Sequence, residues 1–468
     1  MTSFARLTPS LRTELSTLLG EETLRWDEAA LERYGRDETE NLAFRPEAVA
    51  LPTSTEQVSK LLAFANAHRL PVTPRGAGTG LSGGALPVVG GLVLSVERMN
   101  RIRSIEPEDL VAEAEAGVVT GELQRAVEEL GLYYPPDPAS RDTCLLAGNL
   151  AEDSAGPRSL KYGTTRAWVL GLEAVLPNGR VIRPGGRTRK NAAGYHLTQL
   201  LVGSEGTLAV VTAATLRLCA RPKATLSLLL PFSELEGAAA AVSAILARGF
   251  DPASCELLES AALEAVAALE PIPPALSGAA AMLLLELHGD REDELLDRAD
   301  GISRLAEELG AGEALAATDA AEQRRLWAVR RRVGEAVKHR SIYKEADTVV
   351  PRSRLAELVR AARAAATRHG LAAVCYGHAG DGNLHINLLK GDLDEARWQE
   401  SRDAAETELF QAVVALGGTI TGEHGVGWVQ RRHLPLALDP ATLALMRDLK
   451  AAFDPLGILN PGKIFLEP

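Results

Sequence analysis

The sequence PRGAGTGLSGGALP, residues 74–87, decides how the first half of the chain is expected to fold. Its residues 78–83 match the pattern GxGxxG, which in a Rossmann fold leads directly into a helix. Here Pro87 and a short apolar run at 92–96 follow, which leaves room for a strand but not for a helix. A glycine-rich loop can also direct successive backbone amides inward, and such a nest binds phosphate oxygens. We therefore expect a phosphate-binding loop with Arg75 at its start; the alternative is an ordinary surface turn.

Length and composition predict a globular protein of roughly two or three domains, because 468 residues with 46% hydrophobic side chains can bury large cores. The net charge of -12, without a long basic block, argues against nucleic acid as a partner. Four widely separated cysteines without a CxxC pair indicate neither a disulfide framework nor an iron–sulfur cluster. The N-terminus lacks the apolar core of a signal peptide, and no apolar run reaches roughly eighteen residues, so we expect a soluble, cytoplasmic protein.

The first half of the chain is expected to alternate strands and helices in an α+β pattern. Spaced leucines predict a helical segment over residues 8–34. The small-residue stretch 147–163, AGNLAEDSAGPRSLKYG, is expected to be an irregular loop around the same ligand rather than a helix. The other expected elements are helices at 55–68 and 121–131 and strands at 48–51, just before Arg75, and at 92–96, 110–116, 169–176, 181–183 and 209–211.

A separate α+β domain is expected to begin near residue 226. Its pattern of strand, helix, strand and helix occupies 226–230, the stretch up to 248, 282–288 and the stretch up to 309. The end of the chain, residues 453–463, reads as a loop that comes late enough to return to the first domain.

The segment VCYGHAGDGNLHIN, residues 374–387, reads as a β-hairpin with Asp381-Gly382 at its corner. A two-residue turn there would make His378 face His385, and Asn387 would share their side of the strands. Two imidazoles placed in this way can share one divalent cation, and a third ligand with an open position would make such a site catalytic. The alternatives are two polar surface residues or a structural zinc site.

Glu423, in the segment TGEHGVG, is the expected third ligand, and the adjacent His424 could then act as a base. Arg330 and Lys344 are candidates for holding a carboxylate, because arginine binds it through a planar fork and lysine adds a point charge. The alternative for these two residues is a pair of solvated surface charges.

Seven short segments in matching order resemble the FAD-linked 2-hydroxy-acid dehydrogenases of the vanillyl-alcohol oxidase superfamily. They are RGAGTGLSGG, GNLAED, KYG, GSEGTL, GHAGDGNLH, GEHGVG and NPGK, and the resemblance as a whole covers the chain from about residue 48 to the C-terminus. The family includes the FAD subunit of glycolate oxidase, D-lactate dehydrogenase and D-2-hydroxyglutarate dehydrogenase. The resemblance implies an α+β protein made of a PCMH-type FAD-binding domain with two subdomains and an α+β (ferredoxin-like) cap domain. The implied division is a helical segment at 1–40, the FAD-binding domain at 41–222, the substrate or cap domain at 223–435 and a tail at 436–468 that packs on the FAD domain.

The same resemblance implies FAD that is bound without a covalent bond, because Thr79 stands where covalently linked members often carry a histidine. Some positions depart from the family pattern, among them Ala147 before Gly148, and Asp153 where an asparagine is usual. The implied FAD-binding residues are Arg75, Gly76, Ala77, Gly78, Thr79, Gly80, Leu81, Ser82, Asp137, Gly148, Asn149, Glu205, Gly206, Val210, Asn460 and Lys463.

For the reaction, the resemblance implies a divalent metal, zinc by preference, on His378, His385 and Glu423. The implied catalytic residues are His424 as the base, Asn387 on the substrate, and Arg330 and Lys344 on its carboxylate. Metal-assisted deprotonation and hydride transfer to FAD would convert a small D-2-hydroxy acid, D-lactate or glycolate, into the 2-oxo acid. Gly334 stands where the hydroxyglutarate enzyme carries a threonine, which makes D-2-hydroxyglutarate the alternative substrate.

Three other functions stay open at this point: a metal-free flavin oxidase of alditols or lactones, a flavin-binding subunit without activity of its own, and a zinc hydrolase. The implied electron acceptor is a quinone, a cytochrome, an electron-transfer flavoprotein or companion subunits. Peripheral association with a membrane is compatible with this expectation.

Overall fold

The computed structural model describes residues 4–269 and 271–466, which form two compact units. The first unit contains the chain up to Ala155, residues 163–221, and the chain from Glu423 onward. The second unit contains residues 156–162 and 222–422. The sequence assigned residues 423–435 to the second domain, whereas in the structure they belong to the first unit.

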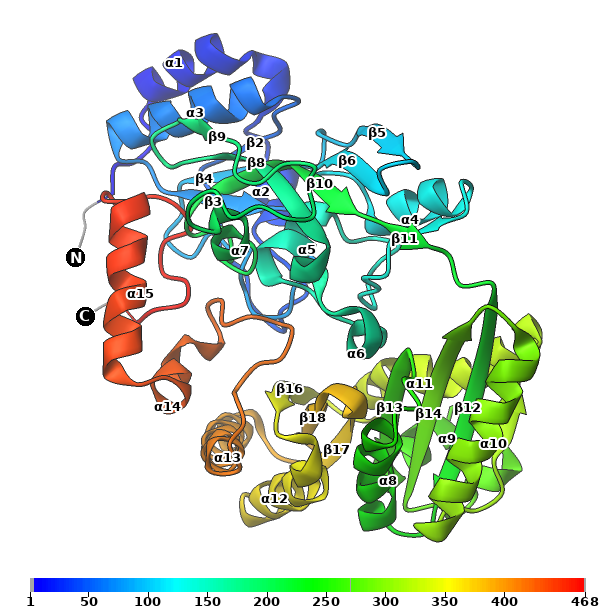
Figure 1. The fold of residues 1–468 in the computed structure, drawn as a ribbon. Helices are drawn as coiled ribbons and strands as arrows, with labels where there is room; N and C mark the ends of the chain where they lie inside the picture. The colour runs from blue at the N-terminus through cyan, green and yellow to red at the C-terminus, as the bar shows by residue number, and fades with distance from the viewer. Residues whose placement is uncertain (1–3, 270, 467–468) are drawn as a thin grey trace. The chain divides into compact units, whose positions relative to one another are not determined.

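A four-stranded sheet with the order β1-β2-β4-β3 lies in the first unit, and β2, β4 and β3 run parallel (Figure 1). The strands are β1 (Leu24–Arg25), β2 (Ala48–Ala50), β3 (Val72–Arg75) and β4 (Leu92–Ser95). Helix α3 (Thr55–His68) begins where the Ser54 hydroxyl accepts a hydrogen bond from the backbone N–H of Gln57. Its apolar face, including Leu61 and Leu62, is fully buried. The glycine loop connects β3 to β4 without a helix, as the sequence predicted.

Residues 8–34 form two helices instead of one helical segment, and this part of the prediction was wrong. Helix α1 (Pro9–Leu19) ends at Gly20, whose φ of 87° is accessible mainly to glycine. The short strand β1 then pairs with β2 before α2 (Glu28–Tyr34) begins at Asp27. The leucine spacing could not reveal this break, because pairing with a distant strand produces it.

The second sheet of the first unit is antiparallel and has the order β5-β6-β10-β8-β9. Its strands are β5 (Ile102–Glu106), β6 (Val111–Glu115), β8 (Val169–Val175), β9 (Val181–Ile182) and β10 (Val210–Arg217). The unit also contains the pair β7 (Leu132–Tyr133) and β11 (Cys219–Ala220) and the helices α4 (Thr120–Glu128), α7 (Leu197–Leu201), α14 (Leu434–Ala437) and α15 (Pro440–Phe453).

The small-residue stretch 147–163 contains helices, which corrects the expectation of an irregular loop. Helix α5 (Leu146–Glu152) buries Leu146 and Leu150 and ends at Asp153, whose φ of 55° is left-handed. The Asp153 carboxylate accepts hydrogen bonds from the backbone and side chain of Arg166, at 2.7 and 2.8 Å. These contacts with a distant residue stabilise a helix that is too short to be recognised from periodicity.

The second unit is built on a seven-stranded antiparallel sheet with the order β15-β12-β14-β13-β17-β18-β16. Its strands are β12 (Ala224–Phe232), β13 (Ser254–Glu259), β14 (Ala281–Gly289), β15 (Leu315–Ala317), β16 (Tyr343–Val349), β17 (Ala372–Gly377) and β18 (Asn383–Leu389). The order β15-β12-β14-β13 is that of a ferredoxin-like unit, and β17, β18 and β16 extend it. The sequence predicted β12 and β14 but missed β13.

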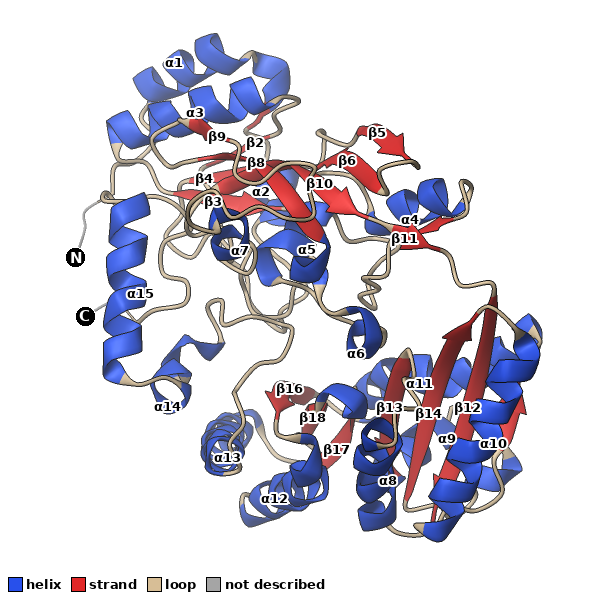
Figure 2. Cartoon of the chain, viewed as in Figure 1, coloured by secondary structure: helices blue, strands red, loops and turns tan. Residues whose placement is uncertain are grey.

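Helices cover both faces of this sheet (Figure 2). They are α8 (Leu235–Ala247), α9 (Ser260–Ala267), α10 (Glu292–Glu308), α11 (Ala320–Arg340), α12 (Leu355–Arg368) and α13 (Glu395–Ala415). Side chains of α9 and α11 form one core with Val374, Tyr376 and Leu389 of the strands. Beyond this core, the same side of β17, β18 and β16 carries polar residues, which form part of the candidate site.

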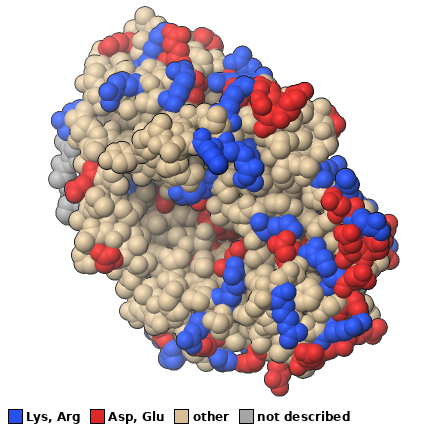
Figure 3. All heavy atoms as spheres, in the orientation of Figure 1, with Lys and Arg blue, Asp and Glu red and all other residues tan. Residues whose placement is uncertain are grey.

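Charged residues of both signs are interspersed on the face of the molecule drawn in Figure 3. Among the described residues, we find no helix that combines the length and the apolar character needed to cross a membrane.

A buried polar network holds the short helix α6 (Ser159–Tyr162) on β14 within the second unit. Arg158 donates to Glu286 at 2.8 Å, Tyr162 hydrogen-bonds to His288 Nδ1 at 2.8 Å, and His288 Nε2 contacts Glu286. Burial alone would raise the pKa of Glu286, but the charge of Arg158 and the hydrogen bond from His288 lower it to about 2. The folded protein therefore favours the ionised carboxylate.

Acid should destabilise the second unit through Glu286. Its depressed pKa stabilises the fold above the ordinary value of 4.5, and this contribution is lost as the pH falls towards about 2. We expect the free energy of unfolding to lose on the order of 3 kcal/mol over this range, and Glu286→Gln to remove that part of the pH dependence. Urea unfolding at several pH values would measure it, with Glu292→Gln in α10 as the control. Equal pH dependence in wild type and Glu286→Gln would contradict the prediction.

Candidate functional site

A cavity of about 250 Å³ lies in the first unit, and its walls come from segments far apart in the sequence. The walls include the glycine loop, the start of α5, residues 204–206 and 209–211, and Glu423 with His424. Of the residues expected to bind FAD, those that line it are Arg75, Gly76, Ala77, Gly78, Thr79, Gly80, Leu81, Gly148, Asn149, Glu205, Gly206 and Val210. The cavity thus unites the glycine loop with two other predicted segments.

The glycine loop holds its shape partly through Arg75. This side chain is buried, and it donates to the backbone oxygens of Arg36 at 2.7 Å and Ala77 at 3.3 Å. Gly78 has a φ of 80°, and a Cβ there would lie 2.0 Å from the Arg75 guanidinium. Arg75 therefore holds the backbone of the glycine loop in place through these contacts. By contrast, a Cβ on Gly148 would meet nothing within 4 Å.

The other four predicted FAD residues are not among those that line the cavity. Two of them, Asn460 and Lys463, brace its walls from the tail. Asn460 Nδ2 donates to the backbone oxygen of Glu205 at 2.7 Å, and Lys463 Nζ donates to that of Leu86 at 2.6 Å. The remaining two are Ser82, which is buried, and Asp137, which is partly buried.

Two glutamates stand beside this cavity, the buried Glu205 and the half-buried Glu152, and the sequence pointed only to Glu205. Glu205 accepts hydrogen bonds from the backbone N–H groups of Val426 at 2.8 Å and Gly427 at 2.6 Å, which fixes the segment after His424. Glu152 lines the cavity, and its Oε2 has no hydrogen-bond partner among the described residues. Burial raises the pKa of both carboxyls. Glu152 was not singled out from the sequence, because the stretch around it is rich in small residues and helix α5 was not expected there.

In the second unit, the structure brings His378 and His385 together, but not in the predicted way. The strand pairing sets Tyr376, not His378, opposite His385, and His378 lies just beyond the end of β17. The turn is longer than two residues, because a short 3₁₀ helix spans Ala379–Asp381. The two imidazole rings are nevertheless near one another, with centroids 5.3 Å apart.

Glu256 of β13 links His378 to Arg330. Its carboxylate oxygens lie 2.8 Å from His378 Nδ1 and 2.6 Å from Arg330 Nε. Burial alone would raise the pKa of Glu256, but the charges of His378 and Arg330 lower it to about 2. A carboxylate on one ring nitrogen fixes the orientation of a histidine and directs the other nitrogen to a ligand. Glu256 was not a candidate from the sequence, because strand β13 was not predicted.

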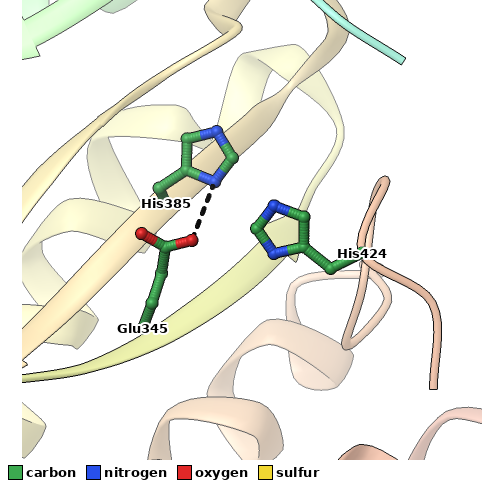
Figure 4. A group of neighbouring side chains, drawn as sticks. All are labelled: Glu345, His385 and His424. Carbon is green, nitrogen blue, oxygen red and sulfur yellow. Dashed lines mark ion pairs between the residues drawn. The ribbon is translucent and has the colours of Figure 1, made fainter. Parts of the chain in front are cut away.

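Two acidic side chains of β16, those of Glu345 and Asp347, lie on the same face as His385. Figure 4 shows Glu345 beside His385. Its Nδ1 is 3.9 Å from Glu345 and 3.8 Å from Asp347. Asp347 also accepts hydrogen bonds from Asn383 Nδ2 at 2.7 Å, Thr421 Oγ1 at 3.0 Å and the backbone N–H of Gly422 at 2.7 Å. Asp347 thereby anchors the last residues of the second unit.

Lys344 lies on the opposite face of β16, so the structure does not bring it to Arg330. Its ammonium is 3.7 Å from the buried Glu406 of α13. Successive residues of a strand point to opposite faces, and the register that places Glu345 opposite Asn387 turns Lys344 away. The structure therefore does not support the expectation that Arg330 and Lys344 together hold one substrate carboxylate.

Asn387 completes this polar face. It is fully buried, and neither polar atom of its side chain makes a well-formed hydrogen bond among the residues described, although its contact with the Tyr376 hydroxyl opposes the rise that burial causes in the pKa of Tyr376. A buried amide of this kind costs free energy unless a ligand or water satisfies it. Its position on the same side as His385 agrees with the sequence.

Two family models match the chain. The "FAD binding domain" matches residues 46–185, and "FAD linked oxidases, C-terminal domain" matches residues 221–464. The chain is 38% identical over 465 residues to the glycolate oxidase subunit GlcD of Bacillus subtilis, covering 98% of this chain and 97% of that protein. It is 40% identical to a D-lactate dehydrogenase of Archaeoglobus fulgidus, with 89% and 90% covered. It is 33% identical to a D-2-hydroxyglutarate dehydrogenase of Stutzerimonas stutzeri, with 98% and 99% covered.

The solved structure of p-cresol methylhydroxylase with substrate bound has the same fold. The TM-score is 0.80 at 20% identity, with 97% of this chain and 96% of that chain covered. The cavity walls suit FAD, because its glycine loop leaves backbone amides without side chains in front of them, as a pyrophosphate requires.

Adding a methyl group to the cavity wall should weaken FAD binding while the fold is preserved. Gly148→Ala places a Cβ where no protein atom lies within 4 Å, and alanine is favourable in helix α5. The added methyl group should compete with the cofactor for space and raise the Kd of FAD about tenfold or more. Titration of the apoprotein with FAD, followed by flavin fluorescence, would measure this. Gly186→Ala, also an open position but outside the cavity walls, is the matched control. An equal Kd in both variants would contradict the prediction.

Proposed function

Because the chain belongs to the FAD-linked oxidase family and is an FAD-dependent oxidoreductase of the 2-hydroxy-acid dehydrogenases, we propose that it oxidises a small D-2-hydroxy acid to the 2-oxo acid. D-Lactate or glycolate is the favoured substrate. Relatives that cover nearly the whole chain carry these names, and they include the glycolate oxidase subunit and the D-lactate dehydrogenase.

The path of the chain at residues 421–424 is the observation that best supports the proposal. Thr421 and Gly422 are hydrogen-bonded to Asp347, on the face of the second unit that carries His385. The next two residues, Glu423 and His424, line the FAD cavity of the first unit. Consecutive Cα atoms are only about 3.8 Å apart. Residues 421–424 are therefore one short stretch of chain, with one end bound to the strand face that carries His385 and the other end in the wall of the cofactor cavity.

In this proposal the protein's own side chains bind and deprotonate the substrate. Arg330, held at its Nε by Glu256, binds the substrate carboxylate. Asn387 hydrogen-bonds to the substrate, which satisfies its buried amide. His424 takes the proton of the 2-hydroxyl group. FAD, when bound, supplies the acceptor for the hydride from the α-carbon.

We further propose that His378, His385 and Glu423 hold a divalent metal ion, with zinc as the favoured identity. Two imidazoles and one carboxylate are a donor set that zinc takes at catalytic sites. The Glu256 carboxylate on His378 Nδ1 is the kind of outer contact that metal-binding histidines usually have. The ion would supply Lewis acidity toward the substrate oxygens.

Replacing His424 should remove turnover while the cofactor stays bound. His424→Ala is expected to lower the rate of flavin reduction by D-lactate by about 10²–10⁴-fold, the usual effect of losing a general base. Anaerobic stopped-flow absorbance would measure the rate, and the flavin spectrum would report FAD content. His339→Ala, on an exposed part of α11, is the control. A normal rate for His424→Ala would remove this residue from the mechanism.

Chelation should inactivate the enzyme reversibly. Dialysis against a strong chelator is expected to remove about one metal ion per chain and most of the activity, and added Zn²⁺ should restore both. His385→Ala should contain no metal from the outset, which elemental analysis of the purified protein would determine. Full activity in metal-depleted protein would instead support the metal-free flavin oxidase considered above.

A further inference from the structure

We propose that Glu152 meets bound FAD as a neutral carboxylic acid, so that FAD binding is coupled to a proton held on this side chain. The inference concerns the cofactor cavity of the first unit, and it holds whichever hydroxy acid the protein oxidises. Glu152 was not among the residues expected to bind FAD.

The position of Glu152 is unfavourable for a charged carboxylate. Glu152 is the last residue of helix α5, and it lines the cavity together with the glycine loop. Its Oε2 is buried and has no hydrogen-bond partner among the described residues. An ionised carboxylate here would lack the donors that offset the loss of hydration, whereas a neutral carboxylic acid avoids most of that cost.

The neighbouring carboxyl, that of Glu205, is better placed to be ionised. Its oxygens accept hydrogen bonds from the backbone N–H groups of Val426 at 2.8 Å and Gly427 at 2.6 Å. The two glutamates approach the same point of the chain, because a Cβ on Gly425 would collide with Glu152 Oε2 and lie 3.2 Å from Glu205 Oε1. Two carboxyls so close are costly to ionise together, and the one without donors keeps the proton.

The other charged groups near Glu152 do not reverse this assignment. Burial raises the pKa of Glu152 well above its ordinary value, and the charges of Glu205 and Asp37 add to the rise. Lys463 opposes it, but burial lowers the pKa of Lys463 to about 7, and its Nζ already donates to Leu86 and Asn460. The other ionisable residues described in the cavity wall are Arg75, Glu423 and His424.

A neutral Glu152 suits FAD, whose pyrophosphate is negatively charged. The glycine loop suited to this pyrophosphate belongs to the same cavity wall as Glu152. An ionised Glu152 would repel the cofactor, so bound FAD holds the pKa of Glu152 above its value in the apoprotein. Affinity is therefore highest where the apoprotein is already protonated. It falls as the pH rises through the pKa of the apoprotein, because binding must then take up a proton.

The test measures the Kd of FAD for the apoprotein by flavin fluorescence from about pH 6 to about pH 9. In wild type the Kd is expected to rise about tenfold or more over this range. Glu152→Gln is neutral at every pH and should keep the low Kd throughout, whereas Glu152→Asp keeps a carboxyl and should retain the rise. Glu129→Gln changes an exposed residue at the end of α4, outside the cavity walls, and should behave as wild type.

A second measurement uses the wild-type protein alone. Calorimetric titration with FAD in buffers of different ionisation enthalpy gives the number of protons taken up, which should increase with pH towards about one per FAD. A wild-type Kd that does not rise with pH, or binding without proton uptake, overturns the inference. An equal rise in Glu152→Gln also overturns it, because the proton would then belong to another group such as Lys463. None of these outcomes requires a hydroxy acid to be oxidised, so they are independent of the proposed function.

Discussion

The hydrogen bonds of Asp347 are the constraint on which the candidate site depends. This buried carboxylate lies beside His385 and receives donors from Asn383, Thr421 and Gly422. A buried carboxylate is costly unless several donors surround it, so the segment that ends the second unit is bound to one place on β16. The next residues are Glu423 and His424, and every role proposed for them requires this anchor.

Other buried carboxylates are likewise stabilised by cations or by hydrogen-bond donors. Glu256 is stabilised by His378 and Arg330, and Glu286 by Arg158 and His288. Glu205 binds two backbone amides of the segment after His424. Each of these carboxylates connects parts of the chain that are far apart in sequence. Compared with a pair of hydrophobic side chains, such a carboxylate contributes the positioning of its partners, because a charge-assisted hydrogen bond fixes their direction.

The sequence predicted the features that local chemistry determines. The glycine loop, the capped helix α3, the neighbouring strands β8 and β9 and the alternation of β18 all depend on neighbouring residues, and each is present. Several expectations failed where distant contacts decide: β1 interrupts residues 8–34 by pairing with β2, helix α5 formed against Arg166, and Lys344 lay on the face opposite to the one assumed. The register of β17 and β18 failed for a local reason, because the turn between them is longer than two residues. Glu256 and Glu152 could not be singled out, because only the folded chain buries them next to the candidate residues.

The position of the tail has a consequence for how the protein is made. Leu459 bridges to Val72 on β3, and Asn460 holds Glu205, so the first unit includes residues that are synthesised only after the second unit. At about 5–20 residues per second, synthesis of the second unit alone delays the closure of the first by roughly 10–40 s. During that interval strand β3, at the edge of the parallel sheet, is uncovered, and the cofactor cavity lacks one of its walls. The second unit can fold on the emerging chain, whereas the first is completed only after the segment from residue 423 onward has been made.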